Sequence, residues 1–198
     1  IRKQFKKDLA QKWILLVESE KNALIDKVDT IDKNQFNDAK KEEIVKEGFT
    51  VAKTKAKNRL STNPFPNVEF ENLNKDELNA IATKIDSDVH TPFNINAEKY
   101  DQSVVNTLNE AKSINDQKQE AINKINDKSE QGEYPNLTDK QRDEFVKLIK
   151  AQPLAKTQEI LVSAKQLNQA IAEAKGVALE KEKELTQNTG LTFEEIPS

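Results

Sequence analysis

The chain has 198 residues, of which 35% are hydrophobic and 33% are charged, with 31 basic residues against 34 acidic ones. Globular domains average about 45–50% apolar and about 25% charged residues, so a thin-cored molecule fits this composition better than a sphere. Disorder is the competing interpretation, but the apolar residues are regularly spaced. Basic and acidic residues are interleaved, which argues against a nucleic-acid partner.

Several kinds of chemistry are excluded by missing residue types. The chain has no Cys, no Met and one His, His90. Disulfides, zinc–thiolate sites, thiol catalysis and multi-His metal sites are therefore excluded within this chain. The longest apolar run, 13–17, has five residues, whereas a membrane span needs about 20, so direct membrane insertion is not expected. Because the first residue is not Met, we expect a processed or excised piece without its signal sequence.

Few Gly and Pro and many Lys, Glu, Gln, Ala and Leu favour helices over sheets. The spacing of apolar residues predicts helices over 2–28, 35–60, 75–90, 96–127, 139–152 and 154–186. Asn74 with Glu77, and Thr138 with Gln141, have the spacing of a capping box at the start of the two short helices. Breaks with Pro at 62–67 and 128–136 separate the elements.

The first and last helices carry the clearest apolar faces. The face of 2–28 consists of Phe5, Leu9, Trp13, Leu16, Val17, Leu24 and Val28. The near-heptad stripe of 154–186 consists of Ile160, Ala164, Leu167, Ile171, Ala174, Ala178 and Leu185. A stripe of this kind predicts partner helices along its whole length. The short helix at 139–152 presents Phe145, Leu148 and Ile149.

Two segments of the chain match each other in order. The matched pairs are 56–60 with 121–125, 65–67 with 134–136, 72–73 with 136–137, Ile81 and Ile85 with Phe145 and Ile149, and 108–111 with 167–170. Each unit is the end of a long helix, a short helix and the start of the next long helix. Three amphipathic segments bury their stripes only against each other, which predicts a three-helix bundle.

The predicted fold is therefore all-α: an elongated, coiled-coil-like rod of tandem three-helix bundles that share their long helices. The expected domains are an N-terminal helical hairpin over 1–60, a three-helix module over 56–127, a second module over 118–187 and a tail over 188–198. The hairpin would be an incomplete module.

Three motifs carry a resemblance to a known family. They are Ala121-Ile122-Asn123, the stretch 136–141 with the sequence Asn-Leu-Thr-Asp-Lys-Gln, and Leu167-Asn168-Gln169-Ala170. With these motifs, the segment 118–175 resembles the GA-like modules of large bacterial surface proteins. Together with the Lys and Asn bias, the whole chain resembles mycoplasmal surface adhesins such as the variable adherence-associated antigens. The resemblance implies cell-surface attachment and binding of host proteins, such as serum albumin or extracellular matrix.

The candidate partner-binding residues are Phe65, Phe70, Tyr134, Lys140 and Arg142. The three aromatic residues flank Pro-containing connections, and aromatic residues are enriched in binding hot spots; the alternative is that they cap the ends of the bundles. Lys140 and Arg142 are expected on the outer face of a short helix, where the alternative is a solvated surface. No catalytic, cofactor or metal site is predicted, because no activated nucleophile, phosphate loop or ligand cluster is present.

The sequence therefore predicts a non-enzymatic bacterial cell-surface adhesin or host-protein-binding ectodomain, located outside the cell with its anchor outside this segment. Its partner would be a host cell-surface, matrix or serum protein. The alternative is an intracellular helical scaffold or coiled-coil interaction protein. A homodimer is a further expectation, because the stripe of the last helix continues past Lys175.

Overall fold

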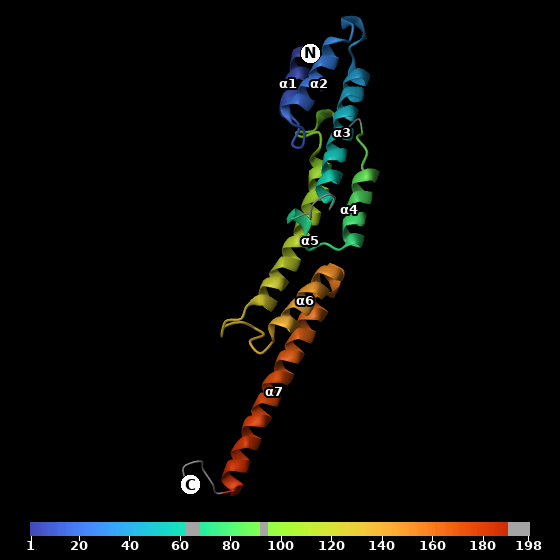
Figure 1. Cartoon of the computed structure of the whole chain (residues 1–198). Helices are drawn as coiled ribbons and strands as arrows, with labels where there is room; N and C mark the ends of the chain where they lie inside the picture. Colours follow the sequence, from blue (N-terminus) through green and yellow to red (C-terminus); the bar gives the residue numbers. More distant parts are fainter. Residues whose placement is uncertain (62–67, 92–94, 190–198) are drawn as a thin grey trace. The chain divides into compact units, whose positions relative to one another are not determined.

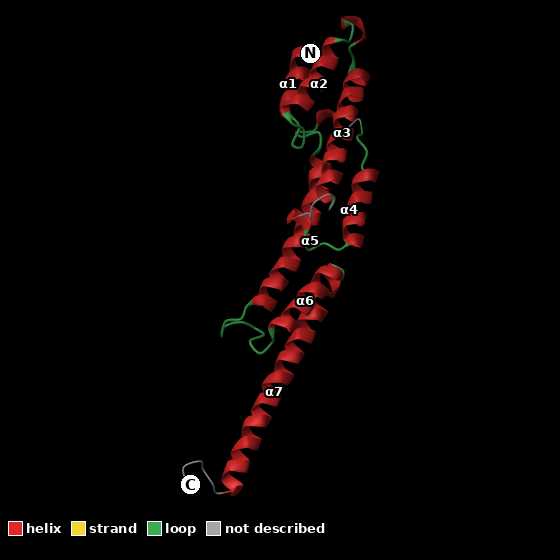
Figure 2. Ribbon diagram, in the orientation of Figure 1, coloured by secondary structure: helices red, strands yellow, loops and turns green. Residues whose placement is uncertain are grey.

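The computed structural model describes residues 1–61, 68–91 and 95–189, and most of them are helical (Figure 1). The α-helices are α1 (Arg2–Gln11), α2 (Glu18–Asp29), α3 (Asp38–Leu60), α4 (Lys75–Ser87), α5 (Gln102–Asn126), α6 (Asp139–Ala151) and α7 (Thr157–Thr189). No strand occurs in these ranges (Figure 2). The predicted all-α class is confirmed.

The chain divides into two compact units, residues 1–116 and 117–198, with the division inside α5. Unit 1 contains α1 to α4 and the first part of α5, and α3 packs against both α2 and α4. Its core includes Leu9, Val28, Val45, Ile85 and Tyr100. Unit 2 contains the end of α5, α6 and α7. Its core includes Ile125, Tyr134, Ile149 and Ala164.

The predicted single helix over 2–28 is wrong, because the chain breaks between α1 and α2. The carboxylate of the buried Asp101 accepts hydrogen bonds from the N–H groups of Ile14, at 3.0 and 3.2 Å, and Leu15, at 2.8 Å. The N–H of Tyr100 donates to the carbonyl oxygen of Lys12 at 2.8 Å. These partners satisfy backbone groups that a continuous helix would use internally. Val17, expected in the apolar face, is exposed.

The break allows the Trp13 ring to lie against α3 at Gly48. A Cβ atom built on Gly48 would be 2.4 Å from Cζ2 and 2.6 Å from Cη2 of this buried ring. We expect Gly48→Ala to lower the free energy of unfolding of unit 1 by about 2 kcal/mol, because overpacking outweighs the gain in helix propensity. Urea unfolding followed by Trp13 fluorescence measures the change.

Gly176 provides the matched control for this prediction. It lies within α7, and a Cβ atom there would meet nothing within 4 Å. Gly176→Ala should therefore stabilise its helix by up to about 1 kcal/mol. If Gly48→Ala also proved neutral or stabilising, the close approach of Trp13 to α3 would be contradicted.

The structure contains three copies of one local pattern, and the sequence comparison found two of them. Each copy has a buried aromatic residue, then a buried Leu three residues later, immediately before a short helix. The copies are Trp13 with Leu16, Phe70 with Leu73, and Tyr134 with Leu137. Counted from that Leu, the inward residues of the short helix fall at the eighth and twelfth positions. These residues are Leu24 and Val28, Ile81 and Ile85, and Phe145 and Ile149.

The start of each short helix is closed by the side chain three residues after its N-cap. The N–H groups of Val17, Asn74 and Thr138 donate to Glu20, Glu77 and Gln141 at 2.8, 3.0 and 2.9 Å. Asn74 and Thr138 complete their boxes by accepting the return hydrogen bond, which confirms both predicted capping boxes. Val17 has no side-chain acceptor. This difference hides the first copy in the sequence.

The end of each short helix is held by a basic residue of the preceding helix. The acceptor is in every copy the carbonyl of the fifteenth residue after the Leu. Arg2 donates to Ile31, Lys53 donates to Asp88 at 2.6 Å, and the fully buried Lys118 donates to Gln152 at 2.8 Å. Cations stabilise the carbonyl end of a helix through its dipole. None of these helices needs a glycine at its end.

The residue before the Leu has its N–H satisfied by a side chain from a later helix or from the residue just before it. Asn115 and Asn168 accept from Asn72 and Asn136 at 3.0 and 2.7 Å. Asn115, and not Asn109, is thus the counterpart of Asn168, so the match of 108–111 with 167–170 is out of register. In the first copy, Asp101 supplies the acceptor for Leu15.

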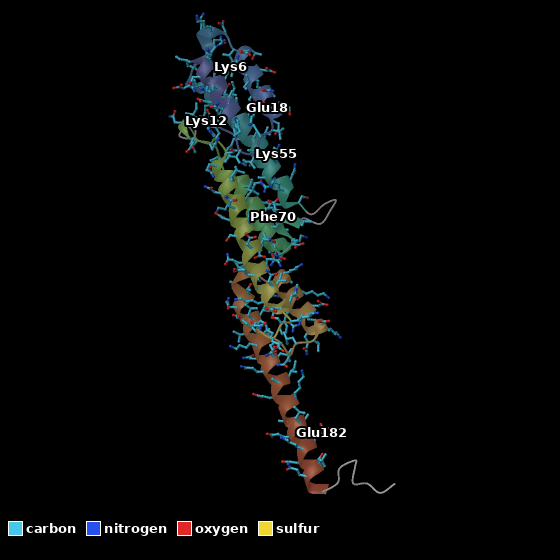
Figure 3. All side chains as sticks on the ribbon, turned by 90° about the vertical axis from the view of Figure 1, so that its left-hand side faces the viewer. Lys6, Lys12, Glu18, Lys55, Phe70 and Glu182 are labelled. Carbon is cyan, nitrogen blue, oxygen red and sulfur yellow. The ribbon has the colours of Figure 1, made fainter. Side chains whose placement is uncertain are left out.

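Unit 2 covers only the first part of α7. Ile160, Leu161 and Ala164 are buried and Leu167 and Ile171 are half-buried. Every side chain from 172 to 187 is exposed, and Glu182 lies on a part of α7 that stands alone (Figure 3). The near-heptad stripe therefore has partner helices within unit 2 only as far as Ile171.

Candidate functional site

The predicted aromatic site residues lie in different environments. Phe65 lies outside the described residues. Phe70 and Tyr134 are buried at 1% and 2% exposure, and their carbonyl groups accept from Leu73 and Leu137 at 3.1 and 3.4 Å. Burial, with a smaller effect from Glu133, raises the pKa of Tyr134 to about 12. Their role in partner binding stays a prediction, and their burial favours the packing alternative.

Lys140 and Arg142 lie on opposite sides of α6. Lys140 is exposed, as predicted. The expectation that Arg142 points outward is wrong, because its side chain is 3% exposed. Its guanidinium group donates to the carbonyl oxygens of Ile125, of Asp127 at 3.3 Å and of Tyr134 at 2.8 Å. Arg142 thus holds the turn between α5 and α6 instead of presenting a charge to a partner.

His90 is buried in unit 1 and paired with α3. Its Nδ1 atom lies 2.6 Å from Oε1 of Glu42, and its ring meets the ring of Phe49 edge-on at 5.6 Å. Nε2 of His90 and Oε2 of Glu42 are buried without a hydrogen-bond partner. Counted from the Leu, the same position is taken by Leu154 in unit 2, so the fold itself does not require a polar residue there.

Two corresponding surface grooves lie between the short helix and the following long helix, one in each unit. In unit 1, Lys84, Ser87 and Asp88 face Ser103, Asn106, Thr107 and Glu110. In unit 2, Phe145, Leu148 and Gln152 face Lys156, Glu159, Ile160 and Ser163. The short-helix positions differ by 64 in number. The long-helix positions differ by 53, which is also the difference between Asn115 and Asn168.

The two grooves differ in chemistry. In unit 1, Lys84 Nζ crosses the groove and lies 2.7 and 2.8 Å from the two carboxylate oxygens of Glu110. In unit 2, the corresponding residues are Leu148 and Ser163, which do not form an ion pair with each other. Leu148 is 44% exposed, although it lies at the mouth of an open groove of about 320 Å³. The floor of this groove is apolar.

The groove of unit 2 is suited to binding an apolar side chain of another protein. Phe145 is half-buried and Ile160 is buried, so they form a preformed apolar floor. Lys156 Nζ lies 3.5 Å from Oε2 of Glu159 and provides a charged rim. An apolar centre with a polar rim is the usual anatomy of a protein-binding surface. We call the seven residues around it the α6–α7 groove.

Sequence reasoning assigned Leu148 to the inner face together with Ile149. Two neighbouring residues point about 100° apart on a helix, and Ile149 takes the inward position, so Leu148 turns to the surface. The internal repeat contained the signal, because the position of Leu148 is occupied by Lys84 in the other copy.

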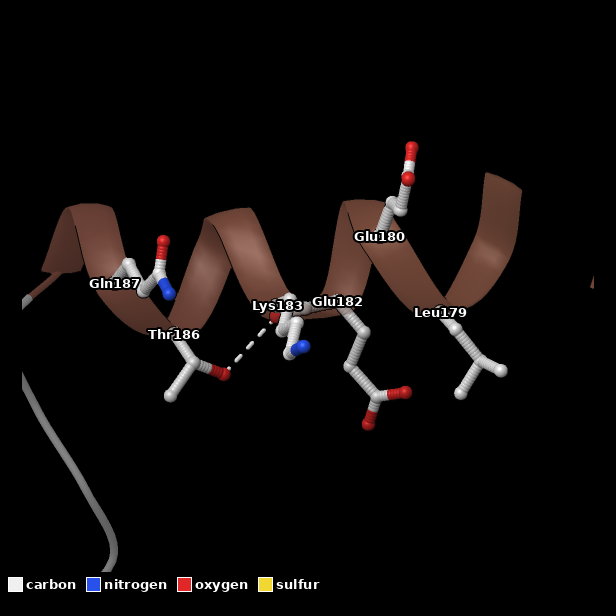
Figure 4. A pocket seen from close by; sticks show the side chains of 6 residues that line it. All are labelled: Leu179, Glu180, Glu182, Lys183, Thr186 and Gln187. Atoms are coloured by element: carbon white, nitrogen blue, oxygen red, sulfur yellow. Dashed lines mark hydrogen bonds between the residues drawn. The ribbon is translucent and has the colours of Figure 1, made fainter. Parts of the chain in front are cut away.

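The exposed part of α7 carries a second surface, formed by Leu179, Glu180, Glu182, Lys183, Thr186 and Gln187 (Figure 4). All six residues come from one helix, and Thr186 Oγ1 donates to the carbonyl oxygen of Glu182 at 3.0 Å. Leu179 is 66% exposed. A surface with a wall on one side only does not enclose a small molecule, but it is suited to packing against another helix.

No protein-family model, curated protein or solved structure matches this chain. Within the described ranges, no helix combines the length and the apolar character needed to cross a bilayer. The same residues contain no group of three or more His, Cys, Asp or Glu side chains placed to hold a metal ion.

Proposed function

We propose that this chain is a non-enzymatic, host-protein-binding ectodomain of a bacterial cell-surface adhesin. The observation that supports this most directly is the α6–α7 groove. In unit 1 the same position of the fold is closed by the pair Lys84–Glu110, so the fold does not need apolar residues there. Exposing Leu148 in unit 2 costs the solvation free energy of an apolar surface, which a partner would recover on binding.

The proposed architecture is a rod of tandem three-helix modules that share their long helices. The packing of α3 against both α2 and α4 supports this arrangement. A rod would hold its binding surfaces away from the cell that carries it. Several weak contacts along the rod would add together through their high effective concentration.

Binding of the purified chain to whole host cells tests the proposal. The decisive variant is Leu148→Lys combined with Ser163→Glu, which places the ion pair of unit 1 into unit 2. Since unit 1 already accommodates this pair, the variant should fold. We expect its apparent affinity for the cells to fall by at least about tenfold, as for the loss of one hot-spot residue.

A matched control is Val162→Lys, which adds a charge to α7 at a residue that is exposed and does not line the groove. It should bind as the parent chain does. Competition with soluble albumin and with matrix proteins then identifies the class of receptor. Equal binding by the ion-pair variant would reject the groove. A folded, helical chain that binds no host cell would replace the proposal with an intracellular helical scaffold.

A further inference from the structure

The second part of α7 lacks partners that every comparable helix in the chain has. The helix before each short helix buries two apolar residues four positions apart: Phe5 and Leu9 in α1, Ala56 and Leu60 in α3, and Ala121 and Ile125 in α5. In α7, the segment 172–187 exposes Val177, Leu179 and Leu185 by 63%, 66% and 65%. These are among the most exposed large apolar side chains in the described ranges.

The sequence that follows repeats the start of a short helix. Each of the three copies has a buried Leu, then the N-cap, then Glu or Gln three residues after the N-cap. The three examples are Leu16-Val17 with Glu20, Leu73-Asn74 with Glu77, and Leu137-Thr138 with Gln141. Leu191-Thr192 with Glu195 has the same spacing. Thr192 and Glu195 are also a residue pair that favours a capping box.

The position of this pattern fits the periodicity of the chain. Leu73 follows Leu16 by 57 residues, Leu137 follows Leu73 by 64, and Leu191 follows Leu137 by 54. We propose that residues 172–187 are the first helix of a fourth copy of the module, covered by a short helix that begins after Thr192 and by the long helix that follows it. This inference concerns assembly of the chain and is independent of ligand binding.

Hydrogen exchange measured by mass spectrometry tests the inference on the 198-residue chain and on an extended chain. The extension consists of residues 145–189 placed after Ser198, because Ser198 follows Leu191 by as many residues as Glu144 follows Leu137. In the 198-residue chain, amides of 172–187 should exchange faster than those of 157–171. In the extended chain, their exchange should slow by at least about tenfold, because helix packing reduces local opening.

The matched control is the extended chain with Leu191→Asp, in which the protection of 172–187 should be lost while that of 117–171 is unchanged. A second extension, residues 24–60, repeats the test with the α2–α3 pair, so that one extension that fails to fold does not decide the result. Unchanged exchange of 172–187 in both extended chains overturns the proposal. Protection in the 198-residue chain that increases with protein concentration overturns it too, because a second copy would then cover α7.

Discussion

Asp101→Ala is expected to lower the free energy of unfolding of unit 1 by about 3 kcal/mol, because two buried N–H groups lose a charged acceptor. The Asp101 side chain is fully buried and accepts from Ile14 and Leu15. It is the contact that joins the break between α1 and α2 to the start of α5. No water reaches this position to replace the carboxylate at low cost.

Urea unfolding followed by Trp13 fluorescence measures this loss, since the Trp13 and Tyr100 rings are 5.1 Å apart in the same core. Asp101→Asn keeps one acceptor oxygen and should lose about half as much. Asp26→Ala, at an exposed residue of α2, is the surface control and should change stability by less than about 0.5 kcal/mol. An alanine variant of Asp101 as stable as the Asp26 control would show that the break does not depend on the carboxylate.

Arg142→Leu is expected to destabilise unit 2 by about 3 kcal/mol, because three carbonyl groups lose a charged donor at a buried position. Those carbonyl groups belong to Ile125, Asp127 and Tyr134, at the end of α5 and in the turn before α6. Leu fills much of the volume but supplies no N–H group. The loss should appear first in the turn, and then as easier opening of the α5–α6 contact.

Hydrogen exchange of the segment 117–151 measures this effect within unit 2. Lys140→Leu is the matched control, because Lys140 lies two residues away on the exposed side of the same helix. It should leave exchange within unit 2 unchanged. Arg142→Lys keeps the charge but has a single donor group in place of the planar fork, so an intermediate effect is expected. Equal exchange in the Leu variants of Arg142 and Lys140 would contradict the buried role of Arg142.

The features that the sequence predicted correctly are local ones. Asn74 with Glu77, and Thr138 with Gln141, form capping boxes because the partners lie three residues apart and need no help from the rest of the fold. The helical class follows from composition and periodicity for the same reason. Local interactions of this kind are visible in one short stretch of residues.

The features that the sequence missed depend on distant partners. The break after α1 needs Asp101, which is 87 residues from Ile14 in the chain. A continuous apolar spacing from Phe5 to Val28 contains no sign of that contact. The first copy of the repeat was missed because Val17 stands where the other copies have a polar N-cap. The outward turn of Leu148 depends on which of two neighbouring apolar residues faces α7, and packing decides this.

The packing of α3 against both α2 and α4 limits how a chain of this kind can change in length. Removing one short helix uncovers the apolar sides of both of its neighbours, and adding one long helix leaves its far side in water. The smallest insertion or deletion that keeps every apolar side covered is one short helix together with one long helix. Duplication in evolution would then proceed in steps of such helix pairs, with new copies starting in the middle of an existing helix.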